Sequence, residues 1–146
     1  MASRPWLSAV GLAAITGART AMGPALVARG ASRRARTIAY VLAALELIGD
    51  KAPITPNRTA WPGLLSRILC GAGVARSVVR RHGRGRGAAG AAMVIGAAAA
   101  IATAFTGLRL RLALTRRLGG GAVANAVAGG LEDAALIAVG TRLATR

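Results

Sequence analysis

The acidic residues of this chain are few, and their spacing predicts a polar site inside apolar helices. The sequence contains only four Asp and Glu residues, and all four lie within or at the edge of apolar runs. Glu46 and Asp50 stand four positions apart, so they would share one face of a helix, and Asn125, Glu132 and Asp133 would share a face of another. An ionised side chain inside a bilayer costs at least about 2.5–3.5 kcal/mol on insertion scales. These carboxylates therefore require partners or water.

Cations occur at positions that could supply those partners. Arg19 and Arg67 interrupt two other apolar stretches, while Lys51 and Arg58 lie at the boundary after Asp50. Two interpretations stay open: buried ion pairs that hold a helix bundle together, or a polar cavity that binds a small ion, a proton or an anionic head group. Both predict that the same residues gather in space. The expected intramembrane polar cluster comprises Arg19, Glu46, Asp50, Lys51, Arg58, Arg67, Asn125, Glu132 and Asp133.

Recognisable catalytic arrangements are missing from the sequence. Lys51 is not preceded by the glycine spacing of a phosphate-binding loop, and His82 stands among arginines with no Ser or Cys placed to partner it. The single Cys70 excludes an intramolecular disulfide and a cysteine-based metal site. We expect no catalytic residue, metal or cofactor, although one cation held by Glu46 and Asp50 is conceivable.

Composition favours a membrane protein over a nucleic-acid binder. The chain has 146 residues, of which 54% are hydrophobic, and it carries 20 Lys and Arg for a net charge of +16. The basic residues are concentrated in clusters at 29–36, 76–86 and 109–117, between long apolar stretches. Nucleic-acid binders spread such charge over polar faces and often add aromatic stacking platforms, but aromatic residues are only 3% here. Basic loops orient multi-spanning proteins and attract acidic lipids.

The elements that would position the polar residues are helices. Alanine richness and the lack of apolar–polar alternation predict an all-α polytopic bundle of four to five transmembrane helices in one domain, 1–146. Residues 87–108 carry no charge and are long enough to cross a hydrocarbon core of roughly 30 Å. Gly23-Pro24 interrupts the first segment, and the short second segment could be re-entrant or broken. The candidate helices are 5–28, 36–50, 60–78, 87–108 and 118–143, with the amino terminus outside and the carboxyl terminus inside.

Small residues recur every four positions in two of these segments. Such stripes let helix backbones approach closely in lipid, so we expect them to pack helices and to support a homo-oligomer. The stripes are Ala92, Gly96, Ala100 and Ala104 in one segment, and Gly121, Asn125, Gly129 and Asp133 in the other.

Five stretches in order resemble a known family. They are "GARTAMGPAL" at 17–26, "ELIGDKAPITPNRT" at 46–59, "SRILCGAGVA" at 66–75, "FTGLRLRLAL" at 105–114 and "LEDAALIAV" at 131–139. Together they resemble the bacterial membrane family catalogued as domain of unknown function four-one-two-six, which has patterns such as Gly-x-Arg-Thr and Glu-x-x-x-Asp-Lys-x-Pro in this order. The resemblance implies a small integral membrane protein and supplies no activity. Members usually carry an aromatic residue after Arg-Thr, where this chain has Ala21 and Met22.

These observations lead to one functional expectation and two alternatives. We expect a multi-pass protein of the bacterial cytoplasmic membrane that binds or permeates a small ion, a proton or an anionic head group. Its partners would be membrane lipids, that ligand and further copies of itself, and not nucleic acid. The first alternative is a non-transporting structural or accessory membrane protein with buried ion pairs. The remote alternative is a basic nucleic-acid-binding protein.

Overall fold

The computed structural model describes residues 4–49 and 61–145, and the regular elements in these ranges are all helical. The expected all-α class is confirmed. The elements are α1 (Arg4–Ala18), α2 (Met22–Val27), the 3-10 turn η1 (Ala28–Gly30), α3 (Arg33–Gly49), α4 (Trp61–Arg81), α5 (Arg86–Arg117) and α6 (Gly121–Ala144).

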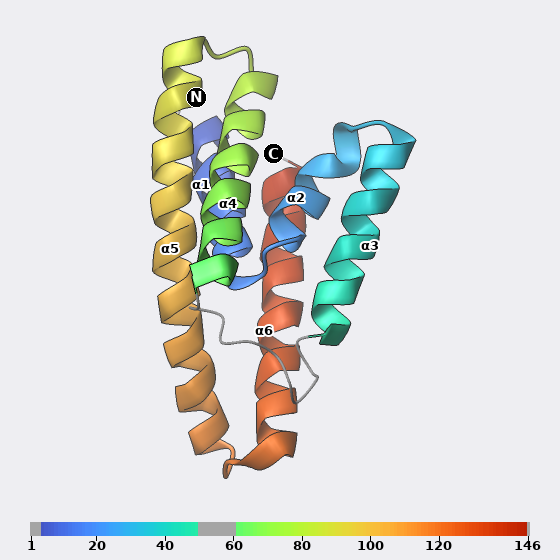
Figure 1. The fold of residues 1–146 in the computed structure, drawn as a ribbon, viewed down its shortest axis with the longest axis vertical. Helices are drawn as coiled ribbons and strands as arrows, with labels where there is room; N and C mark the ends of the chain where they lie inside the picture. The colour runs from blue at the N-terminus through green and yellow to red at the C-terminus, as the bar shows by residue number, and fades with distance from the viewer. Residues whose placement is uncertain (1–3, 50–60, 146) are drawn as a thin grey trace.

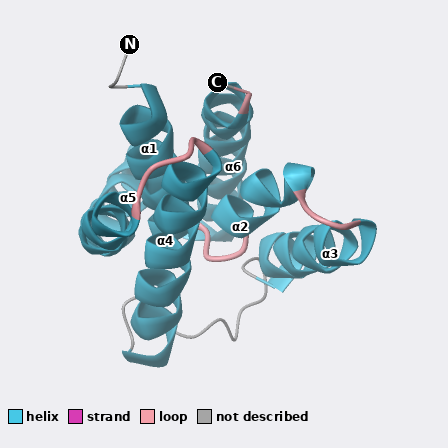
Figure 2. Cartoon of the chain, turned by 90° about the horizontal axis from the view of Figure 1, so that it is seen from above, coloured by secondary structure: helices cyan, strands magenta, loops and turns pink. Residues whose placement is uncertain are grey.

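Helix α5 is the longest element, and α1 and α4 pack against it along their lengths (Figure 1). Helix α6 runs back along α5 after a turn at Gly119, Gly120 and Gly121, whose φ angles of 92°, 74° and 83° favour glycine. Figure 2, seen from above, shows α3 set apart from α5, on the far side of α2. The bundle is therefore dense around α1, α4 and α5 and open around α3 and α6.

Helices α1 and α2 form a hairpin rather than one continuous helix. A Cβ atom added to Gly23 would lie 2.9 Å from the carbonyl oxygen of Leu12, so α2 folds back along α1. Pro24 lies in the first turn of α2, has no N–H, and its ring would clash with the Thr20 carbonyl of an uninterrupted helix. The expected single helix over 5–28 is therefore wrong, and the break falls there rather than in α3. We call residues 4–27 the α1–α2 hairpin and residues 17–21 its tip.

The small-residue stripe of α5 lies at the centre of the packing. Ala92, Gly96, Ala100 and Ala104 are all buried within the chain. A Cβ atom on Gly71 of α4 would lie 2.9 Å from the Gly96 carbonyl oxygen, so the two backbones are in contact. The predicted packing role of this stripe is confirmed, and its contacts are made inside one chain.

Two other sequence expectations need correction. The basic segment 109–117, which lies outside the candidate helices, is the continuation of α5, and α4 extends past the predicted end at 78 to Arg81. The start of α1 and the end of α6 also lie at the same end of the bundle, since Ser8 and Ala144 line one cavity and Gly11 lies against Leu143. The expectation of termini on opposite sides assumed that 5–28 crosses once, whereas the hairpin returns.

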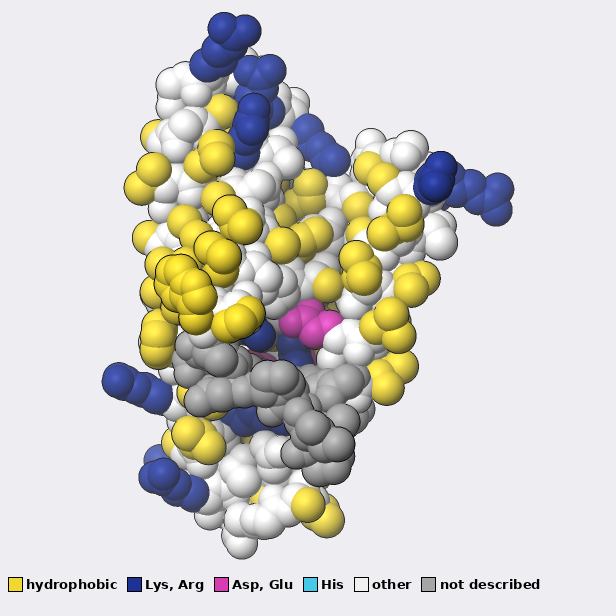
Figure 3. Space-filling view, viewed as in Figure 1, with side chains coloured by type: hydrophobic (Ala, Val, Ile, Leu, Met, Phe, Trp, Pro, Cys, Tyr) yellow, Lys and Arg dark blue, Asp and Glu magenta, His cyan; other side chains and the backbone are white. Residues whose placement is uncertain are grey.

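Among the described helices, α5 and α6 are long and apolar enough to cross a membrane. Large hydrophobic side chains are exposed on both, for example Val94 at 71% and Val123 at 78%. Figure 3 shows such residues spread over one face, with Lys and Arg concentrated at its upper and lower parts. A membrane location agrees with this pattern, and the expected four to five spans stay a prediction.

Candidate functional site at the tip of the hairpin

The break between α1 and α2 leaves backbone groups that a continuous helix would have paired. In an uninterrupted helix the N–H groups of Thr20 and Ala21 would donate to the carbonyls of Thr16 and Gly17. Here they donate instead to the two carboxylate oxygens of Glu46, Oε1 and Oε2, each at 2.7 Å. Helix α3 thus supplies an acceptor for both orphaned donors.

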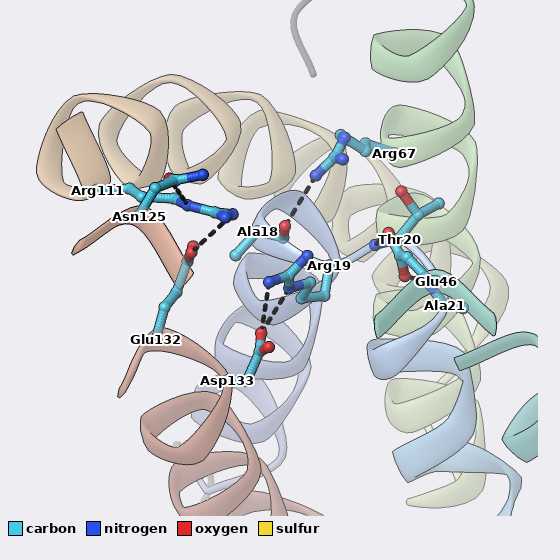
Figure 4. Close-up of polar contacts among 10 residues, drawn as sticks. All are labelled: Ala18, Arg19, Thr20, Ala21, Glu46, Arg67, Arg111, Asn125, Glu132 and Asp133. Carbon is cyan, nitrogen blue, oxygen red and sulfur yellow. Dashed lines mark hydrogen bonds and ion pairs between the residues drawn. The ribbon is translucent and has the colours of Figure 1, made fainter. Parts of the chain in front are cut away.

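The carbonyl side of the break is satisfied by an arginine. Arg67 of α4 donates through Nη1 to the carbonyl oxygens of Gly17 and, at 3.0 Å, Ala18. Arg67 is 7% exposed, so its charge is buried with these acceptors. A carboxylate at the start of α2 and a guanidinium at the end of α1 both match the signs of the helix dipoles. Two charged side chains therefore replace the missing helical hydrogen bonds (Figure 4).

The side chain of Arg19 joins the tip to α6. Its Nε and Nη2 atoms both lie 2.6 Å from Oδ1 of Asp133, and the two side chains are only 3% and 13% exposed. Charge-assisted hydrogen bonds of this length are among the stronger polar contacts in proteins. The ion pair consequently fixes the position of α6 relative to the hairpin.

Arg111 extends the polar cluster from α5 onto α6. Its Nε donates to Oδ1 of Asn125 at 3.0 Å, and its Nη1 lies 3.9 Å from Oε2 of Glu132. The absence of a side chain at Gly129 makes room for the guanidinium, since a Cβ atom there would lie 2.9 Å from Nη2. Arg111 was missed as a site residue because the predicted helix ended at residue 108. Extending the 87–108 helix by one turn places it four residues after Gly107, on the same face.

A large cavity lies beside the cluster, between α1, α5 and α6. Its volume is about 770 Å³, and its walls are mostly Ala, Leu, Ile and Val side chains. Four lining residues carry polar side chains. The Oγ1 of Thr103 donates to Ala14 and that of Thr106 to Ala102, at 2.7 and 2.8 Å, whereas Arg111 and Glu132 place charged groups at the wall.

The structure brings most of the predicted polar residues together, with partners that differ from those expected. Glu46 meets backbone N–H groups rather than an arginine, and Arg19 meets Asp133. Among the described residues, no group of His, Cys, Asp or Glu is arranged to hold a metal ion. Asp50, Lys51 and Arg58 lie outside the described residues. We call Arg19, Glu46, Arg67, Arg111, Asn125, Glu132 and Asp133 the tip cluster.

The charges of the tip cluster balance. Every carboxylate side chain of residues 4–49 and 61–145 belongs to it, and three guanidinium groups accompany them. Because burying an uncompensated charge is expensive, this balance allows the cluster to lie inside the bundle.

No protein-family model matches this chain, and neither the curated proteins nor the solved structures contain a match to it. The resemblance to the membrane family of unknown function therefore stays a prediction.

Proposed function

We propose that this protein is a helical integral membrane protein that binds an amphiphilic molecule in the cavity between α1, α5 and α6. The apolar chain of the ligand occupies the cavity, and its head group lies at Arg111 and Glu132. From the sequence we expected a small ion, a proton or an anionic head group as the ligand, and this proposal keeps the head group. The observation that carries it is a cavity of about 770 Å³ whose walls are apolar except where the tip cluster borders it.

The chemistry of the walls favours an amphiphile over a small ion. A bare cation needs several oxygen ligands around it, whereas the described lining supplies side-chain oxygens only from Thr103, Thr106 and Glu132. Apolar walls provide van der Waals contact along a hydrocarbon chain. The volume also falls within the range of roughly 300–1,000 Å³ that is common for sites of small organic ligands.

Arg111 provides the polar end of the proposed site. A guanidinium carries five N–H donors in a rigid plane, which suits the oxygens of a carboxylate or phosphate head group. Its hydrogen bond to Asn125 and its position over Gly129 hold the plane in place at the cavity wall.

A substitution that fills the cavity tests this proposal. Gly107 lines the cavity, and a Cβ atom there meets only Oε1 of Glu132, at 3.5 Å. We expect Gly107→Leu to weaken the binding of a fluorescent fatty acid, measured by titration of the purified protein in detergent, by about tenfold or more, which corresponds to about 1.4 kcal/mol. The matched control is Gly90→Leu on the same helix, where a Cβ atom meets nothing within 4 Å. Equal affinities for the two variants would contradict the proposal.

The balanced charges of the tip cluster favour a second candidate, a structural or accessory membrane protein. Arg19 is 2% exposed and closes directly on Asp133, as expected for an ion pair that only holds the bundle together. Under this candidate the cavity is filled by bulk lipid chains. Gly107→Leu would then leave fatty-acid binding unchanged, while disruption of the ion pair would still destabilise the fold.

A further inference from the structure

We propose that a second cavity, at the arginine-rich end of the bundle, binds a phosphate group carried by a molecule with an apolar part. This cavity has a volume of about 240 Å³ and lies where the start of α1, the end of α2, η1, the end of α4 and the end of α6 meet. Among the described residues it shares only Leu143 with the lining of the cavity of the proposed function, and its polar residues are different, so each proposal is tested by its own substitutions. Its polar lining residues are Ser8, Arg29, Arg81 and His82.

Arg81 is held in a fixed position at this cavity. Its Nη1 donates to the carbonyl oxygen of Val27 at 2.7 Å, and its guanidinium lies against Gly30, where a Cβ atom would be 3.4 Å from Nη1. One of its five N–H donors is used in that hydrogen bond. An anchored guanidinium with further donors is a favourable group for binding phosphate oxygens.

Two more nitrogen-bearing side chains line the cavity. Arg29 comes from η1, and His82 follows the last turn of α4, where its Nδ1 lies 2.9 Å from the carbonyl oxygen of Val78. That contact leaves Nε2 as the second polar atom of the ring. Two segments distant in sequence, η1 and the end of α4, thus bring the guanidinium groups of Arg29 and Arg81 to one hollow.

Ser8 gives an independent indication of a ligand. It is 3% exposed, it lines the cavity, and within the described residues its Oγ has no hydrogen-bond partner. Buried hydroxyl groups are nearly always paired. The partner that the described chain does not supply would come from the cavity.

The charge of the site selects an anion. Among the described residues no carboxylate side chain lines this cavity, and all carboxylate side chains of these ranges belong to the tip cluster. Basic loops that merely orient a membrane protein need only be exposed, whereas these residues surround a shared hollow with a buried hydroxyl. The remaining lining is apolar, including Leu12, Leu26 and Leu143. A phosphate attached to an apolar body matches both the basic and the apolar parts of the lining. It could belong to a phospholipid or to a soluble phosphate ester.

Paired charge-neutralising variants test the site. The full chain in detergent is titrated with phosphatidylglycerol in mixed micelles, and binding is followed by native mass spectrometry. We expect Arg29→Gln/Arg81→Gln to weaken binding roughly tenfold or more. The control Arg33→Gln/Arg86→Gln removes the same charge at the same end from residues that do not line the cavity, and it should weaken binding by less than about twofold. Equal weakening by both pairs would overturn the proposal in favour of general electrostatic attraction.

A second probe separates the two sources of phosphate. Inorganic phosphate at constant ionic strength replaces the lipid, and the shift in melting temperature of the protein is measured. A shift with phosphatidylglycerol alone assigns a lipid head group, whereas a shift with inorganic phosphate that Arg29→Gln abolishes assigns a soluble ester. Binding of neither probe overturns the site.

Single substitutions keep the test valid if loss of Arg81 disturbs folding. Arg29 is exposed and Ser8→Ala removes only one hydroxyl oxygen, so neither change threatens the bundle. Each should lower phosphatidylglycerol affinity by about threefold. Wild-type affinity in both single variants would contradict the proposal.

Discussion

Arg19 is 2% exposed and its guanidinium ends on one oxygen of Asp133, 114 residues further along the chain. Neither side chain has enough access to solvent to keep its charge hydrated. Such a pair adds little over an apolar packing, yet removing one partner leaves a buried charge uncompensated. Stability therefore depends on the presence of both members or of neither.

We expect Arg19→Gln and Asp133→Asn each to lower the free energy of unfolding by about 3–5 kcal/mol. The double substitution should recover a large part of that loss, because neither charge of this pair remains. Chemical unfolding of the detergent-solubilised protein measures the free energy of unfolding of the wild type, the two single variants and the double variant. Additive losses would show that the two residues act separately.

At this scale, the sequence indicated which residues are buried and charged but not which atoms they meet. The spacing of Glu132 and Asp133 reports only on their own helix, and the two neighbours turn to different arginines, Arg111 and Arg19. The partners depend on how helices that are far apart in sequence pack against one another. Local sequence patterns do not determine that packing. Glu46 was expected to pair with an arginine. Its carboxylate instead accepts hydrogen bonds from the two N–H groups that the break between α1 and α2 leaves unpaired.

The α1–α2 hairpin is the element that depends most on other elements. Its tip exposes donors and acceptors inside the bundle, and Glu46 from α3 and Arg67 from α4 satisfy them. In a bilayer, irregular backbone is tolerated only where protein or an aqueous cavity surrounds it. The hairpin is consequently stable only with α3 and α4 in place.

Replacing Glu46 by Gln tests this dependence. The carboxamide keeps one acceptor oxygen but presents an NH₂ group to the second backbone N–H, which loses its acceptor. We expect a loss of about 1–3 kcal/mol of stability, the cost of one buried unsatisfied donor. The control on the same helix is Arg36→Gln, an exposed position where changes stay within about 0.5 kcal/mol. A neutral Glu46→Gln variant would show that the carboxylate does not cap the tip.

The close contact between α1 and α5 can be tested by a separate substitution. A Cβ atom on Gly17 would lie 2.1 Å from the carbonyl oxygen of Ala100, so Gly17→Ala must move one helix backbone. We expect it to destabilise the protein by about 1–3 kcal/mol. Gly73→Ala on α4 meets nothing within 4 Å and should be neutral or stabilise by up to about 1 kcal/mol through helix propensity. Similar melting temperatures for both variants would contradict the close packing.

Helices with long apolar runs were the predictable elements. The charge-free stretch 87–108 lies within α5, and α4 and α6 begin within a few residues of the predicted starts. Gly23-Pro24 was recognised as an interruption, but a proline does not say in which direction the chain continues. That direction follows from packing between Gly23 and the backbone of α1.

At the scale of the whole molecule, the exposed residues bear on whether this is a membrane protein or a nucleic-acid-binding protein. Large apolar side chains are exposed along α3, α5 and α6, including Ile48 at 70% and Leu110 at 70%. Exposed large apolar side chains on several helices are typical of a surface that contacts a membrane or another protein. The sequence predicted this character from composition, whereas the number of spans depends on how far each helix extends and turns.

We expect the protein to stay in the membrane fraction after a high-salt wash and to require detergent for extraction. Basic residues alone would bind peripherally and be released, because salt screens exposed charges. Membrane fractionation followed by immunoblotting checks this. Release by salt, together with salt-sensitive DNA binding by the released protein, would support the nucleic-acid alternative instead.

The ion pair between Arg19 and Asp133 also has a consequence for the order of assembly. The ribosome adds Arg19 114 residues before Asp133, so the hairpin tip lacks this partner until that part of α6 has been synthesised. Domains generally fold as units during synthesis. Here the hairpin, with a charged arginine at its tip, must wait for α6.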